Sequence, residues 1–141
     1  MHHYKVNLNW TGDRKGEISS PDLNSKIDVA TPPEFPKGIP GIWSPEHLFT
    51  AAVNSCFMTT FLAIAENSKL EYSEFSCESE GLLDTVDGKY VMTEILLRPK
   101  LKLVNIADKE KAEKIFTKSE KACLISNSIK STTRLAGEIT Q

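Results

Sequence analysis

The chain has 141 residues, of which 40% are hydrophobic and 26% are charged. These are the proportions of an ordinary globular protein, so we expect one domain spanning residues 1–141 with a single hydrophobic core, and they exclude a largely disordered chain. A formal net charge of −2 and a pI of about 5.9 leave no strongly basic field, which disfavours nucleic acid as a partner.

The first part of the chain predicts short strands separated by turns. Apolar side chains alternate with polar ones from His3 to Trp10, which is the periodicity of a strand, and this order is unlike that of a secretory signal. Thr11–Glu17 has the composition of a turn, and Ser25–Thr31 predicts a further strand. Four prolines follow in TPPEFPKGIPGIW. Because proline restricts the residue before it, we expect an extended connection there, either a surface crossing or a flap over a pocket.

A long helix is predicted from Ser44 to about Asn67. Ser44 is a suitable N-cap, Pro45 fits the first helical position, and Glu46 adds a negative charge to the first turn. Apolar side chains cover most of its circumference: Leu48, Phe49, Ala52, Val53, Cys56, Phe57, Phe61, Leu62, Ile64 and Ala65. Such a helix is buried on more than one side, so we expect it to lie between a sheet and a second subunit.

Polar residues interrupt this apolar stretch, so no uninterrupted apolar run approaches the about 18 residues that a membrane span requires. The three cysteines of the chain include no CxxC pair, which is unlike a secreted disulfide framework or a zinc site. From these features we expect a cytoplasmic protein that does not bind membranes.

The second half predicts a long hairpin, a helix and a final strand. Strands at Glu71–Asp84 and Tyr90–Leu103 flank Asp87 and Gly88, a strong hairpin signal. A second helix follows Asp108 as its N-cap, with one narrow apolar face and a solvated face rich in lysine. Thr132–Thr140 predicts the last strand. Strands grouped with two helices, rather than alternating with them, indicate the α+β class.

The setting of each cysteine decides its interpretation. Cys77 lies on the apolar face of a predicted strand and is read as a packing residue. Cys56 lies too far into its helix for the dipole to act, and apolar surroundings raise a thiol pKa, so the residues alone favour inert packing. As a nucleophile it would need a cation from elsewhere, and a guanidinium suits that role. Cys123 also faces inward, so it and Cys56 could pair if their Cα atoms come within about 7 Å.

His47 follows the predicted N-cap, and we interpret it as a packing or capping side chain. Metal binding through Cys56, Cys123 and His47 is a weaker alternative. No phosphate-binding, zinc-protease or serine-hydrolase motif occurs in the sequence.

Four segments in this order, TGDRKGE, the Pro/Gly crossing, SPEHLFTAAVNSCF and EKACLISNSIK, resemble the osmotically inducible protein C / organic hydroperoxide resistance (OsmC/Ohr) family. The resemblance covers almost the whole chain. It implies an α+β fold with antiparallel sheets packed on two central helices, assembled as an intertwined homodimer. It also implies a thiol-dependent peroxidase that reduces organic, fatty-acid-like hydroperoxides without metal or haem.

By the same resemblance, Cys56 matches the peroxidatic cysteine and Cys123 the resolving cysteine. Arg14 would favour the Cys56 thiolate and stabilise the departing alkoxide, and Glu46 would hold the guanidinium. The Cys56–Cys123 disulfide would be reopened by an external dithiol, which in the Ohr branch is a lipoylated protein. No other cofactor is implied. Phe57 and Phe61, near Cys56, would favour an organic peroxide.

Three alternatives stay open. Glu46 and Cys56 are about 15 Å apart along a straight helix, so Arg14 must bridge them or Glu46 must serve the other subunit. If Arg14 is not the active-site arginine, Arg98 and Arg134 are the others in the chain. A different class of function is a non-catalytic module that binds an apolar small molecule in the same cleft, with the thiols as packing.

Overall fold

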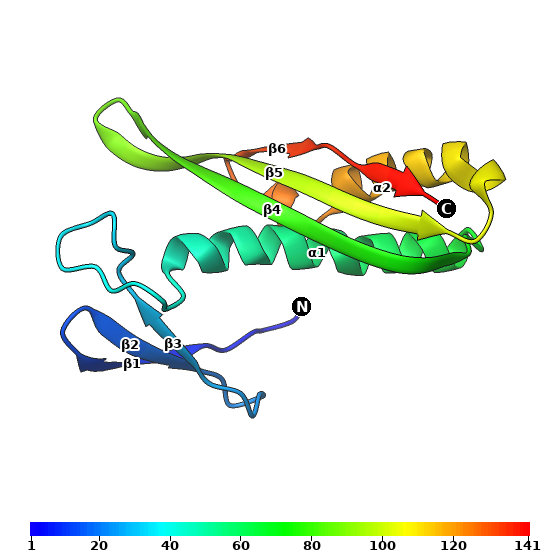
Figure 1. The fold of residues 1–141 in the computed structure, drawn as a ribbon. Helices are drawn as coiled ribbons and strands as arrows, with labels where there is room; N and C mark the ends of the chain where they lie inside the picture. Colours follow the sequence, from blue (N-terminus) through cyan, green and yellow to red (C-terminus); the bar gives the residue numbers. More distant parts are fainter. The chain divides into compact units, whose positions relative to one another are not determined.

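The computed structural model describes all 141 residues and divides into two compact units, Met1–Leu48 and Phe49–Gln141 (Figure 1). Each unit is described by itself, and the expectation of one domain over residues 1–141 stays a prediction. In chain order the elements are β1 Asn7–Gly12, β2 Lys15–Ser19, β3 Ile27–Ala30, α1 Pro45–Asn67, β4 Tyr72–Val86, β5 Lys89–Leu103, η1 Ile106–Asp108, α2 Lys109–Ala122, η2 Ser126–Ser128, β6 Thr132–Leu135 and β7 Glu138–Thr140.

The first unit holds a three-stranded antiparallel sheet in the order β1-β2-β3. The turn between β1 and β2 is tighter than the sequence predicts, because the strands continue to Gly12 and resume at Lys15. Gly12 has a φ of 131°, which glycine adopts readily because it lacks a Cβ atom. Asp13 has a φ of 45°, close to the left-handed region in which aspartate is enriched. Arg14 is thereby placed at the exposed tip of this hairpin.

The prediction of an extended crossing between β3 and α1 is wrong. The chain folds back on itself through three backbone hydrogen bonds, from Phe35 N–H to Pro32, from Gly38 N–H to Phe35, and from Ile39 N–H to Thr31, at 2.9–3.1 Å. A side chain at Gly38 would overlap the Pro32 carbonyl, so only glycine permits this close approach. Prolines that restrict single residues are therefore compatible with consecutive turns.

Helix α1 begins and ends where the sequence predicts. Ser44 caps it, with its hydroxyl accepting from the N–H of His47 at 3.2 Å. The His47 ring nitrogen Nδ1 lies 2.6 Å from the same hydroxyl, and the ring meets Trp43 edge-on with centroids 6.1 Å apart. His47 is therefore a capping and packing residue, as predicted.

The second unit contains the long hairpin β4–β5, with Asp87 and Gly88 at positive φ in its turn, as predicted. The last strand differs from the prediction in two ways. It is broken into β6 and β7, and both pair with β5 in the parallel sense, so this sheet is mixed rather than wholly antiparallel. Gly137 lies at the break, where a Cβ atom would come within 2.9 Å of the Phe116 ring.

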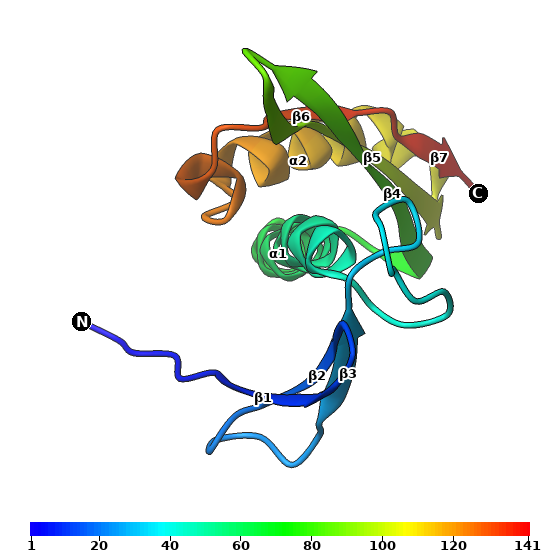
Figure 2. The ribbon, with the colours of Figure 1, turned by 90° about the vertical axis from the view of Figure 1, so that its left-hand side faces the viewer.

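The core of the second unit lies between the sheet and the two helices. Figure 2, which looks along α1, shows α1 and α2 on one side of the strands. Helix α1 contributes a stripe at i, i+4 spacing, and every second residue of β5 from Ile95 to Leu103 is buried. Phe61 lies at the centre of this core and is fully buried, with ring centroids 4.5 Å from Phe75 and 5.4 Å from Phe116.

Helix α1 is apolar beyond this buried stripe. Met58 and Leu62 are 40% and 38% exposed although both are large apolar residues. By length and composition α1 is also the one helix that could cross a membrane. Its stripe of Val53, Phe57, Phe61 and Ala65, however, is packed in the core of a globular unit. A second subunit over the exposed face stays a prediction.

Candidate active site

Cys56 lies in the middle of α1 and is half-buried, and four hydrogen-bonding groups of the second unit act on the pKa of its thiol. The donors are the thiol of Cys123, the backbone N–H groups of Leu124 and Ile125, and the hydroxyl of Thr60. Thr60 is one helical turn beyond Cys56, so its side chain lies on the same face of α1. Three of the four donors therefore come from the chain at the end of α2, far from Cys56 in sequence.

These donors change the acidity of Cys56. Burial by itself raises the pKa of the thiol, but the hydrogen bonds from Cys123, Ile125, Thr60 and Leu124 together outweigh it, so the pKa is lower than that of an ordinary cysteine. The groups that lower the pKa of Cys56 within the second unit are all uncharged, and the predicted role of a guanidinium at this thiol stays a prediction. The thiolate is the nucleophilic form, so the site favours reactivity at Cys56.

Cys123 differs from Cys56 in its burial and in the direction of its pKa shift. It is fully buried and lies just beyond the last helical residue, Ala122, with φ −61° and ψ 112°, so it is not on the helix face where the sequence places it. Burial, the hydrogen bond to Cys56 and the negative charge of an ionised Cys56 all raise its pKa, against weaker lowering by the N–H and hydroxyl of Ser126. The two thiols titrate as a coupled pair, in which the negative charge is favoured at Cys56 over Cys123.

Cys77 takes no part in this pair. It lies on β4, where burial raises the pKa of its thiol to about 11, and the Asn54 side-chain amide donates to its carbonyl at 2.9 Å. A thiol with that pKa is protonated near neutral pH, which agrees with the interpretation of Cys77 as a packing residue.

Arg14 and Glu46 belong to the first unit, whereas Cys56 belongs to the second. Arg14 is exposed and lines a mostly apolar pocket of about 280 Å³ with Leu8 and Trp10 among its walls. The roles of Arg14 and Glu46 at Cys56 therefore stay predictions. Of the other two arginines, Arg98 pairs with Glu80 and Arg134 with Glu94, each at 3.1 Å.

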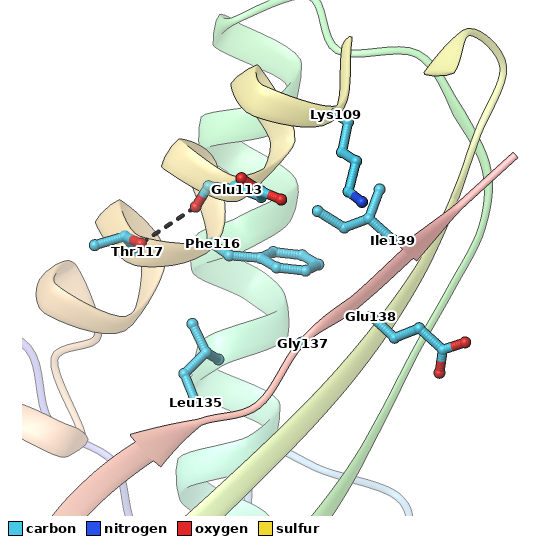
Figure 3. A pocket seen from close by; sticks show the side chains of 8 residues that line it. All are labelled: Lys109, Glu113, Phe116, Thr117, Leu135, Gly137, Glu138 and Ile139. Carbon is cyan, nitrogen blue, oxygen red and sulfur yellow. Dashed lines mark hydrogen bonds between the residues drawn. The ribbon is translucent and has the colours of Figure 1, made fainter. Parts of the chain in front are cut away.

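A separate cleft of about 430 Å³ lies between α2 and the strands β6 and β7. Phe116, Ile139, Lys109, Glu113 and Glu138 are among the residues that line it, and Figure 3 shows the side chains of Phe116 and Ile139 extending into the space between α2 and β7. No cysteine lines this cleft. The second unit also contains no group of three or more His, Cys, Asp or Glu side chains able to hold a metal ion.

Sequence reasoning missed the donors to Cys56 and misplaced two aromatic residues. Backbone N–H groups leave no trace in side-chain chemistry, so Leu124 and Ile125 could not be found, whereas Thr60, four residues after Cys56, was a visible signal. Phe57 and Phe61 are fully buried in the core, so they do not form a wall that a peroxide could meet. Leu124, whose backbone N–H lowers the pKa of Cys56, has a side chain that is 67% exposed.

Cys56 and Cys123 therefore lie together in an α+β fold, with the pKa of Cys56 lowered and the pKa of Cys123 raised. The chain matches the family model described as OsmC-like protein over residues 38–136. It is also 30% identical over 139 residues to the uncharacterized protein YmaD of Bacillus subtilis strain 168, covering 95% of this chain and 91% of that protein. The chain therefore belongs to the OsmC-like family.

Solved structures show the same fold. An OsmC-like protein of unknown function from Vibrio cholerae matches with a TM-score of 0.87 at 22% identity, over 97% of this chain and 99% of that one. An organic hydroperoxide resistance protein OsmC from Legionella pneumophila matches with a TM-score of 0.78 at 24% identity, over 100% and 98%. OhrB, the organic hydroperoxide resistance protein of Bacillus subtilis, matches with a TM-score of 0.66 at 22% identity, over 98% of each chain.

Proposed function

We propose that the protein is a thiol-dependent peroxidase that reduces organic hydroperoxides to alcohols. The observation that carries this proposal is the contact between Cys56, whose pKa is lowered, and Cys123, whose pKa is raised. Opposite pKa shifts of two neighbouring thiols fit an attacking thiolate and a resolving thiol better than they fit two packing residues. Fold neighbours named for organic hydroperoxide resistance support the same reaction class.

The proposed reaction has two steps. The Cys56 thiolate attacks one peroxide oxygen, the O–O bond breaks, and the alkoxide leaves and takes up a proton, which gives a Cys56 sulfenic acid and an alcohol. The sulfur of Cys123 then attacks the sulfenic sulfur, water leaves, and a Cys56–Cys123 disulfide forms. An external dithiol, for which lipoyl groups are a candidate, returns both cysteines to thiols by exchange.

Arg14 and Glu46 complete the proposed site. A guanidinium near the reacting oxygens would stabilise the alkoxide as the O–O bond breaks. Glu46 would orient that guanidinium through a bidentate ion pair. Within the first unit Arg14 is exposed, so its side chain is available for such a role.

The preference for an organic substrate is proposed from the surface beside Cys56. The sulfur is in contact with the backbone of Leu124 and Ile125, and both residues have apolar side chains that are not fully buried. An alkyl or aryl group on the peroxide would bury apolar surface there, whereas hydrogen peroxide would not.

A homodimer is proposed from apolar surface that a single chain leaves exposed. Along β1 and the residues before it, Tyr4, Val6, Leu8 and Trp10 are 63–89% exposed, and Met58 and Leu62 are exposed on α1. Exposed apolar rows of this kind mark interaction surfaces. A cytoplasmic location is part of the same proposal, because thiols that cycle through a dithiol require a reducing compartment.

The test is consumption of cumene hydroperoxide with dihydrolipoamide as reductant, comparing wild type with Cys56→Ser and with the matched control Cys77→Ser. We expect turnover in wild type and Cys77→Ser and loss of turnover in Cys56→Ser. Equal rates in wild type and Cys56→Ser would contradict the proposal. If the thiols also failed to react with peroxide and an apolar molecule copurified with the protein, the non-catalytic binding module would be favoured instead.

A further inference from the structure

The side chain of Cys123 points inward between two neighbours that face solvent. Helix α2 ends at Ala122, and Cys123 follows it in an extended conformation, with φ −61° and ψ 112°. Successive side chains of an extended segment point in opposite directions. Ala122 and Leu124 are exposed, whereas the side chain of Cys123 has no exposed surface. The backbone at this point therefore directs the sulfur of Cys123 into the protein.

Asn127 holds the turn that contains Cys123, which spans residues 123–128. Its backbone N–H donates to the carbonyl of Cys123 at 3.1 Å, and its side-chain amide donates to the carbonyl of Lys121 at 3.0 Å. The Lys121 carbonyl is among the last of α2, which have no partner within the helix. The exposed residue Asn127 therefore bonds to the backbone on both sides of the junction between Ala122 and Cys123.

Further contacts close the same turn. The Ser128 hydroxyl donates to the carbonyl of Leu124 at 2.7 Å, and the Ser128 N–H donates to the carbonyl of Ile125 at 3.0 Å. Ile125 and Ile129 pack against the hydrophobic core of the second unit. Exposure of the Cys123 sulfur requires local opening of these contacts, so the sulfur stays covered while the turn is closed.

Cys56 differs from Cys123 because it is partly exposed. The proposed peroxidase reaction also requires that a molecule from solution reach the Cys56 sulfur. Once the Cys56–Cys123 disulfide has formed, a thiolate from solution must approach one of its two sulfurs, and the rate depends on access to that sulfur. Access therefore favours attack at Cys56.

The acidity of the leaving thiol alone would favour attack at the other sulfur. A thiol of lower pKa leaves faster, and the pKa of Cys56 is lowered whereas that of Cys123 is raised. Cys56 would therefore be the better leaving group in an attack on Cys123. A sulfur with no exposed surface is attacked only after the turn opens, however, so access outweighs leaving-group acidity here.

We propose that Asn127 is a positioning residue for Cys123, and that the closed turn confines attack by an external thiol to the sulfur of Cys56. This inference rests on the proposed disulfide and deepens it, because it names the sulfur at which the dithiol reductant reacts. The reductant thiolate bonds to the Cys56 sulfur, the S–S bond breaks, and the Cys123 sulfur leaves with the electron pair and takes up a proton. The second thiol of the reductant then attacks the reductant's bonded sulfur, which releases Cys56 as a thiolate and closes the reductant's own disulfide.

The test locates the first thiol that bonds to the oxidised protein. The disulfide is formed with diamide, which oxidises two thiols to a disulfide and is itself reduced to a hydrazine, so no peroxide is used. The oxidised protein is mixed with glutathione, a monothiol, and the exchange is stopped with acid at early times. A peptic peptide map at acid pH then measures the glutathione bonded to Cys56 and to Cys123. Protein unfolded in urea is the control in which both sulfurs are accessible.

In folded wild type we expect about tenfold or more glutathione on Cys56 than on Cys123, and comparable amounts in urea. Asn127→Asp keeps the shape of the side chain but deletes the amide donor. It should lower the ratio by about 2- to 12-fold, because loss of one hydrogen bond raises the population of the open turn by that factor.

Thr117→Val is the matched control for Asn127→Asp. It deletes an exposed hydroxyl that donates to another carbonyl of α2, that of Glu113, at 3.2 Å (Figure 3). This variant should leave the glutathione ratio unchanged. A merely structural effect of losing one bond on α2 would instead appear in both variants.

Glutathione on Cys123 in an amount equal to or above that on Cys56 in folded wild type would overturn the proposal. The same ratio in wild type and Asn127→Asp would overturn the role of Asn127. If Asn127→Asp failed to fold, judged by circular dichroism, Asn127→Ala would take its place.

Failure of this inference is distinguishable from failure of the proposed function. If diamide did not join Cys56 to Cys123, both this inference and the disulfide step of the proposed reaction would be wrong. Because neither diamide nor glutathione is a peroxide, the glutathione ratio decides the inference independently of the turnover assay, which measures peroxidase activity.

Discussion

Oxidation of Cys56 and Cys123 to a disulfide should stabilise the fold. The bond would close a loop of 67 residues, from position 56 to position 123. Loop-closure entropy for that length predicts a stabilisation of about 4 kcal/mol relative to the reduced protein. The oxidised protein also loses the hydrogen bonds to the Cys56 thiolate, and hydrogen bonds to a charged group stabilise the folded state by about 1.5–3 kcal/mol. This loss offsets part of the gain from the disulfide.

The expected net gain is therefore about 2 kcal/mol. For a chain of this length that corresponds to a rise in Tm of about 6–8 °C. The assay is thermal unfolding of protein oxidised with one equivalent of cumene hydroperoxide, beside the reduced protein at the same concentration. The concentration is held fixed because a dimer adds its own dependence.

Cys123→Ser is the control, since it keeps a hydroxyl donor near Cys56 but cannot form the bond. We expect no rise in Tm when this variant is oxidised. A wild-type protein whose Tm stays the same or falls on oxidation would refute the reasoning, as would an equal rise in Cys123→Ser. The first outcome would mean that closing the bond distorts the turn after α2.

Three further predictions concern acidity and packing. Because the thiolate reacts and the pKa of Cys56 is lowered, the single-turnover rate with peroxide should rise with pH, with a midpoint below the usual cysteine value of about 8.5. A midpoint at or above that pH contradicts the account. Cys77→Ser should leave peroxide turnover unchanged, because the Cys77 pKa of about 11 keeps that thiol protonated, and a large loss of turnover would count against it. Gly81→Ala should lower the free energy of unfolding in urea by about 1–3 kcal/mol, because the added Cβ overlaps Thr50 Oγ1 and lies 2.7 Å from the Met92 side chain. An unchanged free energy of unfolding would contradict this and would show that α1 can move away from β4 without cost.

The sequence predicts the parts of the fold that local signals determine. The sequence predicts the cap of helix α1 at Ser44, its first residue at Pro45 and its end at about Asn67, and the structure has the helix at Pro45–Asn67 with Ser44 as its cap. The hairpin turn at Asp87 and Gly88 is likewise specified by two residues that tolerate positive φ. In both cases the information lies within a few neighbouring positions.

The features that sequence reasoning missed depend on distant contacts. The break between β6 and β7 follows from parallel pairing with β5 and from the close approach of Gly137 to Phe116, neither of which leaves a local pattern. Two of the four groups that lower the pKa of Cys56 are backbone N–H groups 68 and 69 residues later in the chain, at Leu124 and Ile125. Side-chain chemistry suggested a cation, and the neutral donors were found only in the structure.

The most direct test of the account is a peptide map of reduced protein after one equivalent of cumene hydroperoxide. The account predicts a peptide in which Cys56 and Cys123 of the same chain are joined, with a loss of two hydrogens and with Cys77 still a free thiol. A map in which Cys56 is unmodified, or in which Cys77 reacts as fast as Cys56, would contradict it.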